Sequence, residues 1–174
     1  MRFYEALDLA PSLALDSGDL QRRFYERSRQ WHPDRFSRAG KEAQETALEK
    51  SAVLNDAFRT LRDPVARAEY FLEENGIVAA KAPPAELLEE VFDLNMALEE
   101  LREGDESARP RLADAEKRFV EMRAEIDARL GELFGAYDAS SNAPLLSEIR
   151  RALDRRRYVS NLVSEVQKEL ANRN

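Results

Sequence analysis

The sequence contains no cysteine, and this absence removes several kinds of site at once. Disulfides are excluded, and so are zinc and iron–sulfur sites that use cysteine ligands. The chain has a single histidine, His32, and a metal site needs several converging donors. We therefore predict that the protein binds no metal and no cofactor, and the lack of cysteine fits a reducing compartment.

The sequence also lacks long apolar runs and an excess of positive charge. No apolar run approaches the ~20 residues of a membrane-spanning helix. The opening residues 2–5 indicate a folded domain and not a signal peptide, so we expect a cytoplasmic protein with no membrane contact. The formal net charge of −7 argues against broad nucleic-acid binding, and nucleic acid is not expected as a partner.

What the 174 residues do contain is 43% apolar residues, which recur at spacings of three and four. This pattern predicts an all-α fold with enough apolar surface for a core. Asp16 and Asp63 are good N-caps, and Pro64 suits a first helical position. In the second helix, Leu20, Phe24 and Trp31 form the apolar stripe. The predicted helices cover about 3–9, 16–31, 41–61, 64–75, 85–103, 110–137 and 144–170.

The last three predicted helices carry heptad-like stripes, which favour an antiparallel three-helix bundle. Residues 77–84 are small and apolar and end in two prolines, so they indicate a short, fairly stiff linker. We therefore predict two domains, 1–76 and 85–174. The stripes consist of Leu112, Phe119, Ile126 and Leu133 in one helix and of Leu145, Ala152, Val159 and Val166 in the next.

The most informative motif is His32-Pro33-Asp34, which lies between two predicted helices. It follows a basic amphipathic segment, Asp19 to Trp31, and precedes the helix that begins near Lys41. The tripeptide alone could be a simple helix stop, because proline removes a backbone donor and clashes with the preceding turn. The two flanking helices favour a specialised loop instead.

Three segments together resemble a J-domain, the helical-hairpin module that stimulates ATP hydrolysis by DnaK-class chaperones. They are residues 24–36 (FYERSRQWHPDRF), the opening 3–9, and residues 55–70. In that family the loop tripeptide and the basic surface of the second helix engage the ATP-bound chaperone. The resemblance thus implies a chaperone-binding set of His32, Pro33, Asp34, Arg22, Arg23, Arg27, Arg29 and Arg35.

The arginines of the second helix form a local basic surface in an acidic protein. From Asp19 to Trp31 four arginines face two acids, while Tyr25 and Glu26 stand where many J-domains carry lysine or arginine. Surface charge usually belongs to a solvated helix face. The local inversion of sign instead favours docking to an acidic surface of a partner.

The fifth predicted helix carries more apolar residues than a bundle core needs. Leu87, Val91, Leu94 and Leu98 account for the core stripe, and Leu88, Phe92 and Met96 remain on a neighbouring stripe. Large apolar side chains on a second face suggest a partner surface.

An N-terminal J-domain, a short linker and an acidic three-helix bundle resemble the HscB-type co-chaperones of iron–sulfur cluster assembly. Residues 90–98 are similar to the bundle's entry helix in that family, although Glu89 replaces a usual methionine and Met96 a usual glutamate. The resemblance implies that the iron–sulfur cluster scaffold protein contacts Leu88, Glu89, Phe92, Asp93, Asn95, Met96 and Tyr158.

A basic cluster in the last helix comprises Arg150, Arg151, Arg155, Arg156 and Arg157. We favour the interpretation that it balances the acidic first helix of the bundle, since surface charge usually serves solvation. A nucleic-acid patch is the alternative, but no second strip of aromatic and basic residues accompanies it.

The resemblance implies a co-chaperone that stimulates the ATPase of a DnaK/HscA-class chaperone and delivers the cluster scaffold protein to it. The alternatives are a J-protein for another client class, or a J-like structural or regulatory protein that is silent toward chaperones. We expect no enzymatic activity and no catalytic residue, because no nucleophile or second base is marked near His32.

Overall fold

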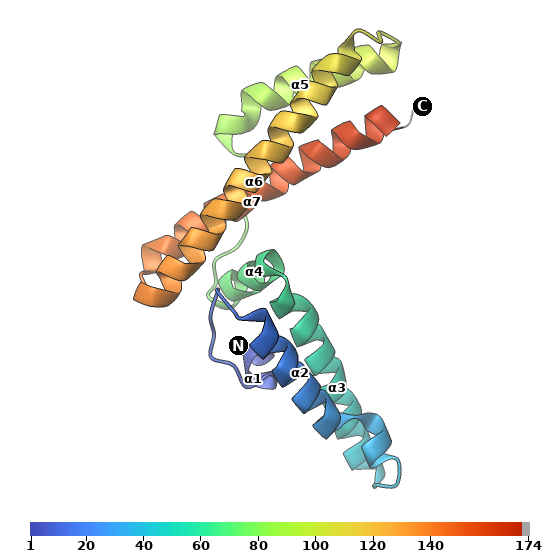
Figure 1. Ribbon diagram of the computed structural model, residues 1–174, viewed down its shortest axis with the longest axis vertical. Coiled ribbons are helices and arrows are strands. Elements are labelled where there is room, and N and C mark those ends of the chain that lie inside the picture. The colour runs from blue at the N-terminus through green and yellow to red at the C-terminus, as the bar shows by residue number, and fades with distance from the viewer. Residues whose placement is uncertain (172–174) are drawn as a thin grey trace. The chain divides into compact units, whose positions relative to one another are not determined.

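The computed structural model describes residues 1–171, and no β-strand occurs in that range (Figure 1). The predicted all-α fold is confirmed. Helix boundaries agree with the predicted ones to within a few residues. The elements are α1 (Arg2–Ala6), α2 (Ser17–Trp31), the 3₁₀ helix η1 (Pro33–Phe36), α3 (Lys41–Arg62), α4 (Pro64–Glu74), the 3₁₀ helix η2 (Ala85–Leu87), α5 (Leu88–Glu103), α6 (Ala108–Ser140) and α7 (Ala143–Ala171).

The described chain forms two compact units that differ in two places from the predicted division into 1–76, 77–84 and 85–174. The first unit comprises Met1–Ile77 together with Phe134–Asn142, and the second begins at Val78. Residues 134–142 join the first unit because their side chains pack and hydrogen-bond there. The segment 78–84 belongs to the second unit, where α7 holds it by hydrogen bonds described below. Independent folding of the predicted domains stays a prediction.

In the first unit, α2 and α3 lie side by side as a helical hairpin (Figure 1). The Asp16 carboxylate caps α2 by accepting a hydrogen bond from the Asp19 N–H at 2.7 Å, as predicted. Leu20 is buried, and Phe24 stacks on Phe58 of α3 with ring centroids 4.2 Å apart. Phe24 and Trp31 are only half-buried, because they lie at the edge of the hairpin.

Helix α1 ends earlier than predicted, at Ala6 and not at Leu9. The chain turns at Asp8, which adopts a left-handed φ of 56°, and the Leu9 N–H returns to the Tyr4 carbonyl at 2.9 Å. The turn buries Leu7 and places the Asp8 carboxylate within reach of arginines on α2. Short-range periodicity could not show this turn, because it depends on contacts with α2.

The junction of α3 and α4 follows its predicted chemistry. Asp63 accepts hydrogen bonds from the N–H groups of Val65 and Ala66 at 2.9 and 2.8 Å, and Pro64 occupies the first turn. The chain leaves α4 through Gly76, whose φ of 75° is left-handed.

Asp138 fastens residues 134–142 to the loop between α1 and α2. Its carboxylate accepts hydrogen bonds from the Ser12 hydroxyl (2.7 Å), the Leu13 N–H (3.0 Å) and the Ala14 N–H (2.7 Å). Tyr137 packs edge-on against Phe71 of α4, with ring centroids 5.5 Å apart. The loop's backbone donors are thus satisfied by a residue that lies 124 or more positions away in sequence.

In the second unit, polar contacts show that α6 and α7 run antiparallel. Arg129 lies 3.6 Å from Glu148, Asp127 pairs with Arg156, and Glu116 accepts a hydrogen bond from Gln167 at 2.8 Å. The partners therefore occur in opposite order along the two helices. Arg102 connects α5 to Glu169 of α7 at 3.1 Å, which completes a three-helix arrangement.

The predicted core stripe of α6 is correct: Leu112, Phe119, Ile126 and Leu133 are all buried. In α7 the stripe is wrong in its first half. Leu145 and Ala152 are half-buried, while their neighbours Leu146, Ile149 and Leu153 fill the core. A strict seven-residue spacing drifts around a straight α-helix, so one heptad register cannot face the core along the whole length of α7.

We predict that Asp138→Ala destabilises the first unit by about 1–3 kcal/mol, because three hydrogen bonds lose their common acceptor. Urea unfolding can be followed by the fluorescence of Trp31, the only tryptophan, which lies in that unit. Asp114→Ala is the matched control, since Asp114 is exposed on α6 without a partner among residues 1–171. Superimposable unfolding curves for the two variants would show that the contact does not stabilise the unit.

Candidate functional site

The loop that carries His32-Pro33-Asp34 is held in one conformation by its neighbours. Pro33 starts η1 directly after α2 ends. Trp31 before the loop stacks on Phe36 after it, with centroids 5.9 Å apart and planes 3° from parallel. The Lys50 ammonium of α3 lies 3.5 Å from the Trp31 ring centroid, a cation–π contact. These contacts join both ends of the loop to the hairpin.

Within this loop, His32 and Asp34 present their side chains to solvent. His32 Nδ1 accepts a hydrogen bond from the Asp34 N–H at 3.3 Å and lies 3.5 Å from Asp34 Oδ2. The two side chains are 58% and 89% exposed. The imidazole therefore helps to order the backbone at Asp34, while the carboxylate stays accessible to a cationic partner group.

Three of the predicted chaperone-binding arginines on α2 have acidic partners within the first unit. Arg22 and Arg23 both bind Asp19, and Arg23 Nε lies 2.8 Å from its carboxylate. The hydrogen bond from Arg23, reinforced by the one from Arg22, lowers the pKa of Asp19. Arg27 lies 3.6 Å from the Asp8 carboxylate.

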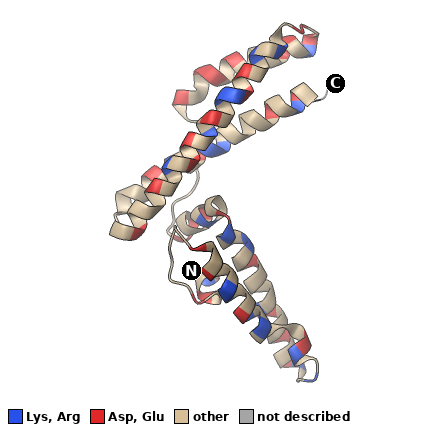
Figure 2. Cartoon of the chain, in the orientation of Figure 1, with Lys and Arg blue, Asp and Glu red and all other residues tan. Residues whose placement is uncertain are grey.

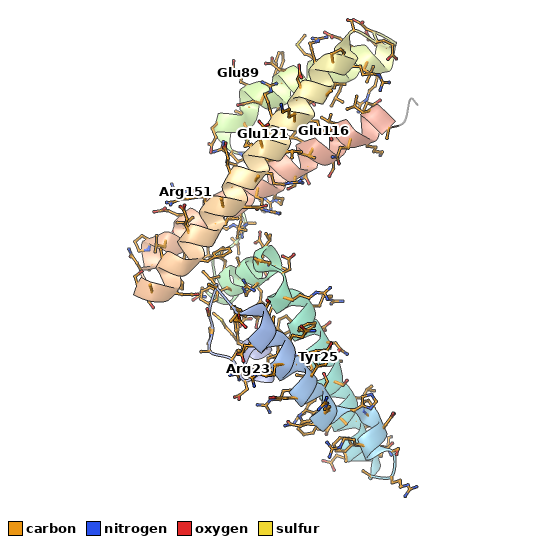
Figure 3. All side chains as sticks on the ribbon, in the orientation of Figure 1. Arg23, Tyr25, Glu89, Glu116, Glu121 and Arg151 are labelled. Atoms are coloured by element: carbon orange, nitrogen blue, oxygen red, sulfur yellow. The ribbon has the colours of Figure 1, made fainter. Side chains whose placement is uncertain are left out.

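Arg29 is the α2 arginine whose side chain makes no ion pair or hydrogen bond within residues 1–171. Its backbone carbonyl accepts a hydrogen bond from Arg35 Nη1 at 3.0 Å, which fixes Arg35 beside the loop. Basic and acidic residues alternate along α2 (Figure 2), and Figure 3 labels Arg23 and Tyr25 on this helix. The structure thus places the predicted chaperone-binding residues at α2 and η1. Among the arginines of α2, the Arg29 side chain is the one that no acidic group of the described residues competes to bind.

The second predicted surface lies on α5, where core and exposed residues separate clearly. Leu87, Leu94 and Leu98 are at most 3% exposed, whereas Leu88, Phe92 and Met96 are 53%, 64% and 48% exposed. Glu89, Asp93 and Asn95 are exposed as well, and Val91 is half-buried. The apolar strip of Leu88, Phe92 and Met96 is therefore open to solvent and bordered by carboxylates.

Tyr158, the seventh predicted scaffold residue, is engaged elsewhere. Its hydroxyl donates a hydrogen bond to the Lys81 carbonyl at 3.0 Å, and Arg157 donates to the Ala80 carbonyl at 2.7 Å. Asp154, which is 5% exposed, accepts a hydrogen bond from the Ala80 N–H at 3.1 Å. Tyr158 therefore holds the segment 78–84 against α7, and its hydroxyl is occupied by this contact.

The basic cluster of α7 is only partly explained by charge balance. Arg150 lies 3.0 Å and Arg157 3.4 Å from Asp154, and Arg156 binds Asp127 of α6. These acids belong to α6 and α7, whereas we expected the cluster to balance the acidic helix α5.

Two general properties follow from the described residues. No group of three or more His, Asp or Glu side chains in residues 1–171 is placed to hold a metal ion, and the chain has no cysteine. In the same range no helix combines the length and the apolar character needed to cross a membrane. The absence of a cofactor and the cytoplasmic location stay predictions.

Comparisons with known proteins agree with this geometry. The model of the DnaJ domain matches residues 2–70, and that of the HSCB C-terminal oligomerisation domain matches residues 83–167. A helical hairpin that displays a His-Pro-Asp loop, followed by such a bundle, defines a J-domain co-chaperone.

The full-length relatives are more specific. The co-chaperone protein HscB homolog of Vibrio vulnificus (strain YJ016) is 30% identical over 176 residues, which cover 96% of this chain and 95% of the relative. The chain therefore belongs to the HscB family of J-domain co-chaperones, the family that the sequence resemblance connects with iron–sulfur cluster assembly.

Solved structures show the same fold. The chaperone HscB from Vibrio cholerae has a TM-score of 0.67 and 27% identity, and the match covers 97% of this chain and 96% of that one. Human co-chaperone HscB has a TM-score of 0.65 at 23% identity, over 96% of this chain and 81% of the human one.

Sequence reasoning missed the residues that support the two surfaces. Lys50 and Phe36 brace the loop through Trp31, and Asp154 anchors the segment 78–84. The only local signal was the spacing of Arg150 and Asp154, four residues apart on one helix. The other contacts join distant segments and have no signature in a single sequence.

We predict that Tyr158→Phe loosens the segment 78–84 without unfolding the protein, because the ring stays and one hydrogen bond is lost. Trypsin should then cleave after the exposed Lys81 about three to ten times faster, as expected for one hydrogen bond of ordinary net strength. Mass spectrometry of early digestion products measures this rate. Tyr25→Phe, a variant on α2, is the control and should digest like the parent; equal rates in both variants would exclude the fastening role.

Proposed function

We propose that this chain stimulates ATP hydrolysis by a DnaK/HscA-class chaperone and brings the iron–sulfur cluster scaffold protein to it. It acts by binding both proteins and performs no chemistry of its own. The observation that carries the proposal is the Asp34 carboxylate, which is 89% exposed on a loop that stacking contacts hold rigid.

A rigid, exposed carboxylate suits a partner that changes conformation with its nucleotide. The loop loses little conformational freedom on binding, so more of the contact energy remains for affinity. A ligand shifts a conformational equilibrium only if it binds one state better than the other. A cationic pocket on the chaperone that accepts Asp34 in its ATP-bound state alone would meet this condition, and Arg29 would add a contact on α2.

The surface on α5 supports the second half of the proposal. Leu88, Phe92 and Met96 form an apolar strip bordered by Glu89 and Asp93, and aromatic residues at the centre of such strips often dominate binding. Phe92 is 64% exposed, so its ring contributes little to the core of the second unit. The family model over residues 83–167 and the HscB relatives support the cluster scaffold as the partner that binds this strip.

Asp34→Asn should abolish ATPase stimulation and leave the fold unchanged. Replacing the carboxylate by an amide removes a charge whose pairing at an interface is worth about 2–5 kcal/mol. Steady-state ATP hydrolysis by the cognate chaperone, with and without scaffold, measures the effect. Asp114→Asn on α6 is the matched control and should stimulate normally.

Circular dichroism must show both variants folded. Near-normal stimulation by folded Asp34→Asn would then contradict the docking role of the loop. A parent protein that fails to stimulate at all would favour a J-like protein that is silent toward chaperones.

Phe92→Ala should weaken scaffold binding by at least about thirtyfold, since a central aromatic anchor contributes roughly 2 kcal/mol or more. The melting temperature should change little, because the ring is mostly exposed. Isothermal titration calorimetry and thermal unfolding on the same samples measure the two effects. Leu94→Ala, two residues along α5 and 3% exposed, provides the contrast: it should cost about 2–5 kcal/mol of stability.

Val120→Ala provides the surface control, since Val120 is 37% exposed on α6 and lies outside the strip. Should Phe92→Ala lower the melting temperature and leave affinity unchanged, Phe92 would be a structural residue. If the parent protein binds no scaffold, the proposed client is wrong and the protein is a J-protein for another client class.

A further inference from the structure

Two arginines of the α7 cluster, Arg151 and Arg155, have side chains that pair with no acidic residue among residues 1–171. Three of their neighbours in the cluster bind Asp154 or Asp127. Neither Arg151 nor Arg155 forms an ion pair or hydrogen bond within residues 1–171. They are four residues apart, so both side chains lie on one face of α7.

This face borders a cavity of about 430 Å³ within the second unit. Met122 and Ile126 of α6 supply its apolar part, and Glu86 and Glu125 also line it. Arg129, which also lines the cavity, is already paired with Glu132 at 2.9 Å and Glu148 at 3.6 Å. The uncommitted cations of the cavity are therefore Arg151 and Arg155. Figure 3 labels Arg151, whose side chain extends from the ribbon.

Arg155 has a donor that no described residue satisfies. Its Nε atom is buried and has no hydrogen-bond partner among the described residues. A buried donor without an acceptor costs free energy, and most such groups in folded proteins are satisfied by protein, water or ligand. A guanidinium offers planar, paired donors that fit the two oxygens of a carboxylate.

We propose that Arg151 and Arg155 bind a carboxylate side chain of the cluster scaffold protein, with the apolar part of the cavity receiving the adjoining residue. The proposal rests on the scaffold role proposed above, and it adds a second contact, on α7, to the one proposed for the strip on α5. Continuity supports this partner, because Glu86 lies two positions before Leu88, where the apolar strip begins.

The two acids that line the cavity argue against nucleic acid as its ligand. A phosphate backbone brings a continuous row of negative charges and needs several cations in line. Glu86 and Glu125 in the lining would repel several of these phosphates, whereas a single carboxylate needs only the two arginines. The cavity therefore fits one acidic side chain of a protein segment.

Arg155→Met tests the proposal most sharply, because it removes the unsatisfied donor and keeps an apolar side chain of comparable length. We expect an unchanged or raised melting temperature together with scaffold affinity at least about tenfold weaker, as for a lost hydrogen bond to a charged group. A purely structural arginine would show the reverse, a lower melting temperature with unchanged affinity, and that result would overturn the proposal.

Arg151→Glu provides a second variant that does not depend on burial, because Arg151 is exposed. It should also weaken scaffold binding at least tenfold, and the loss should shrink at high salt as the charges are screened. Lys168→Glu is the matched control: it reverses an exposed charge on the same helix and should bind like the parent.

The outcomes separate this proposal from the scaffold role itself. If the parent binds scaffold and Phe92→Ala abolishes binding while both arginine variants bind normally, only the proposal about Arg151 and Arg155 fails. If the parent binds no scaffold, both fail. Binding of a single-stranded oligonucleotide by the parent but not by Arg151→Glu would replace the acidic protein segment with nucleic acid.

Discussion

The first unit depends on the buried guanidinium of Arg67. This side chain donates hydrogen bonds to the Leu13 carbonyl at 2.8 Å and the Leu61 carbonyl at 2.6 Å, and the residue is only 6% exposed. Burial lowers the pKa of Arg67, and nearby Tyr4 and Asp138 oppose this shift. A buried charge is tolerated only where hydrogen bonds satisfy it. Arg67 thus ties α4 to the end of α3 and to the loop before α2.

The same rule, applied in the opposite direction, supports the docking surfaces proposed above. Charges that serve the fold have partners: Asp138 accepts three hydrogen bonds, and Asp154 binds two arginines and a backbone N–H. Asp34, by contrast, is held in place through its backbone and keeps its carboxylate exposed. Stacking of Trp31 on Phe36 orders the loop without consuming its polar groups. The residues that order the loop are therefore different from the residue whose carboxylate is open to a partner.

Sequence patterns predicted most of the fold because the helices follow local rules. Caps at Asp16 and Asp63 and the stop at Pro33 depend on neighbouring residues, so their positions were correct. The exposed strip on α5 was also predictable, because a helix can turn only one stripe toward a core. The role of Tyr158 and the packing of residues 134–142 were not, since they arise from contacts between segments far apart in the chain.

The exposed apolar strip on α5 could cause unspecific association, and the charged residues beside it limit this risk. Exposed apolar patches favour association with other proteins. Phe92 is 64% exposed, so the strip needs a feature that restricts which proteins bind to it. Carboxylates along α5, visible as red segments in Figure 2, repel acidic surfaces and other copies of the same strip. A partner must offer both an apolar surface and compatible charge. Because the loop and the strip belong to one chain, a scaffold bound at the strip, as proposed here, would reach a chaperone bound at the loop at a raised effective concentration. Under that proposal neither surface would need high affinity, and release of the scaffold could remain fast.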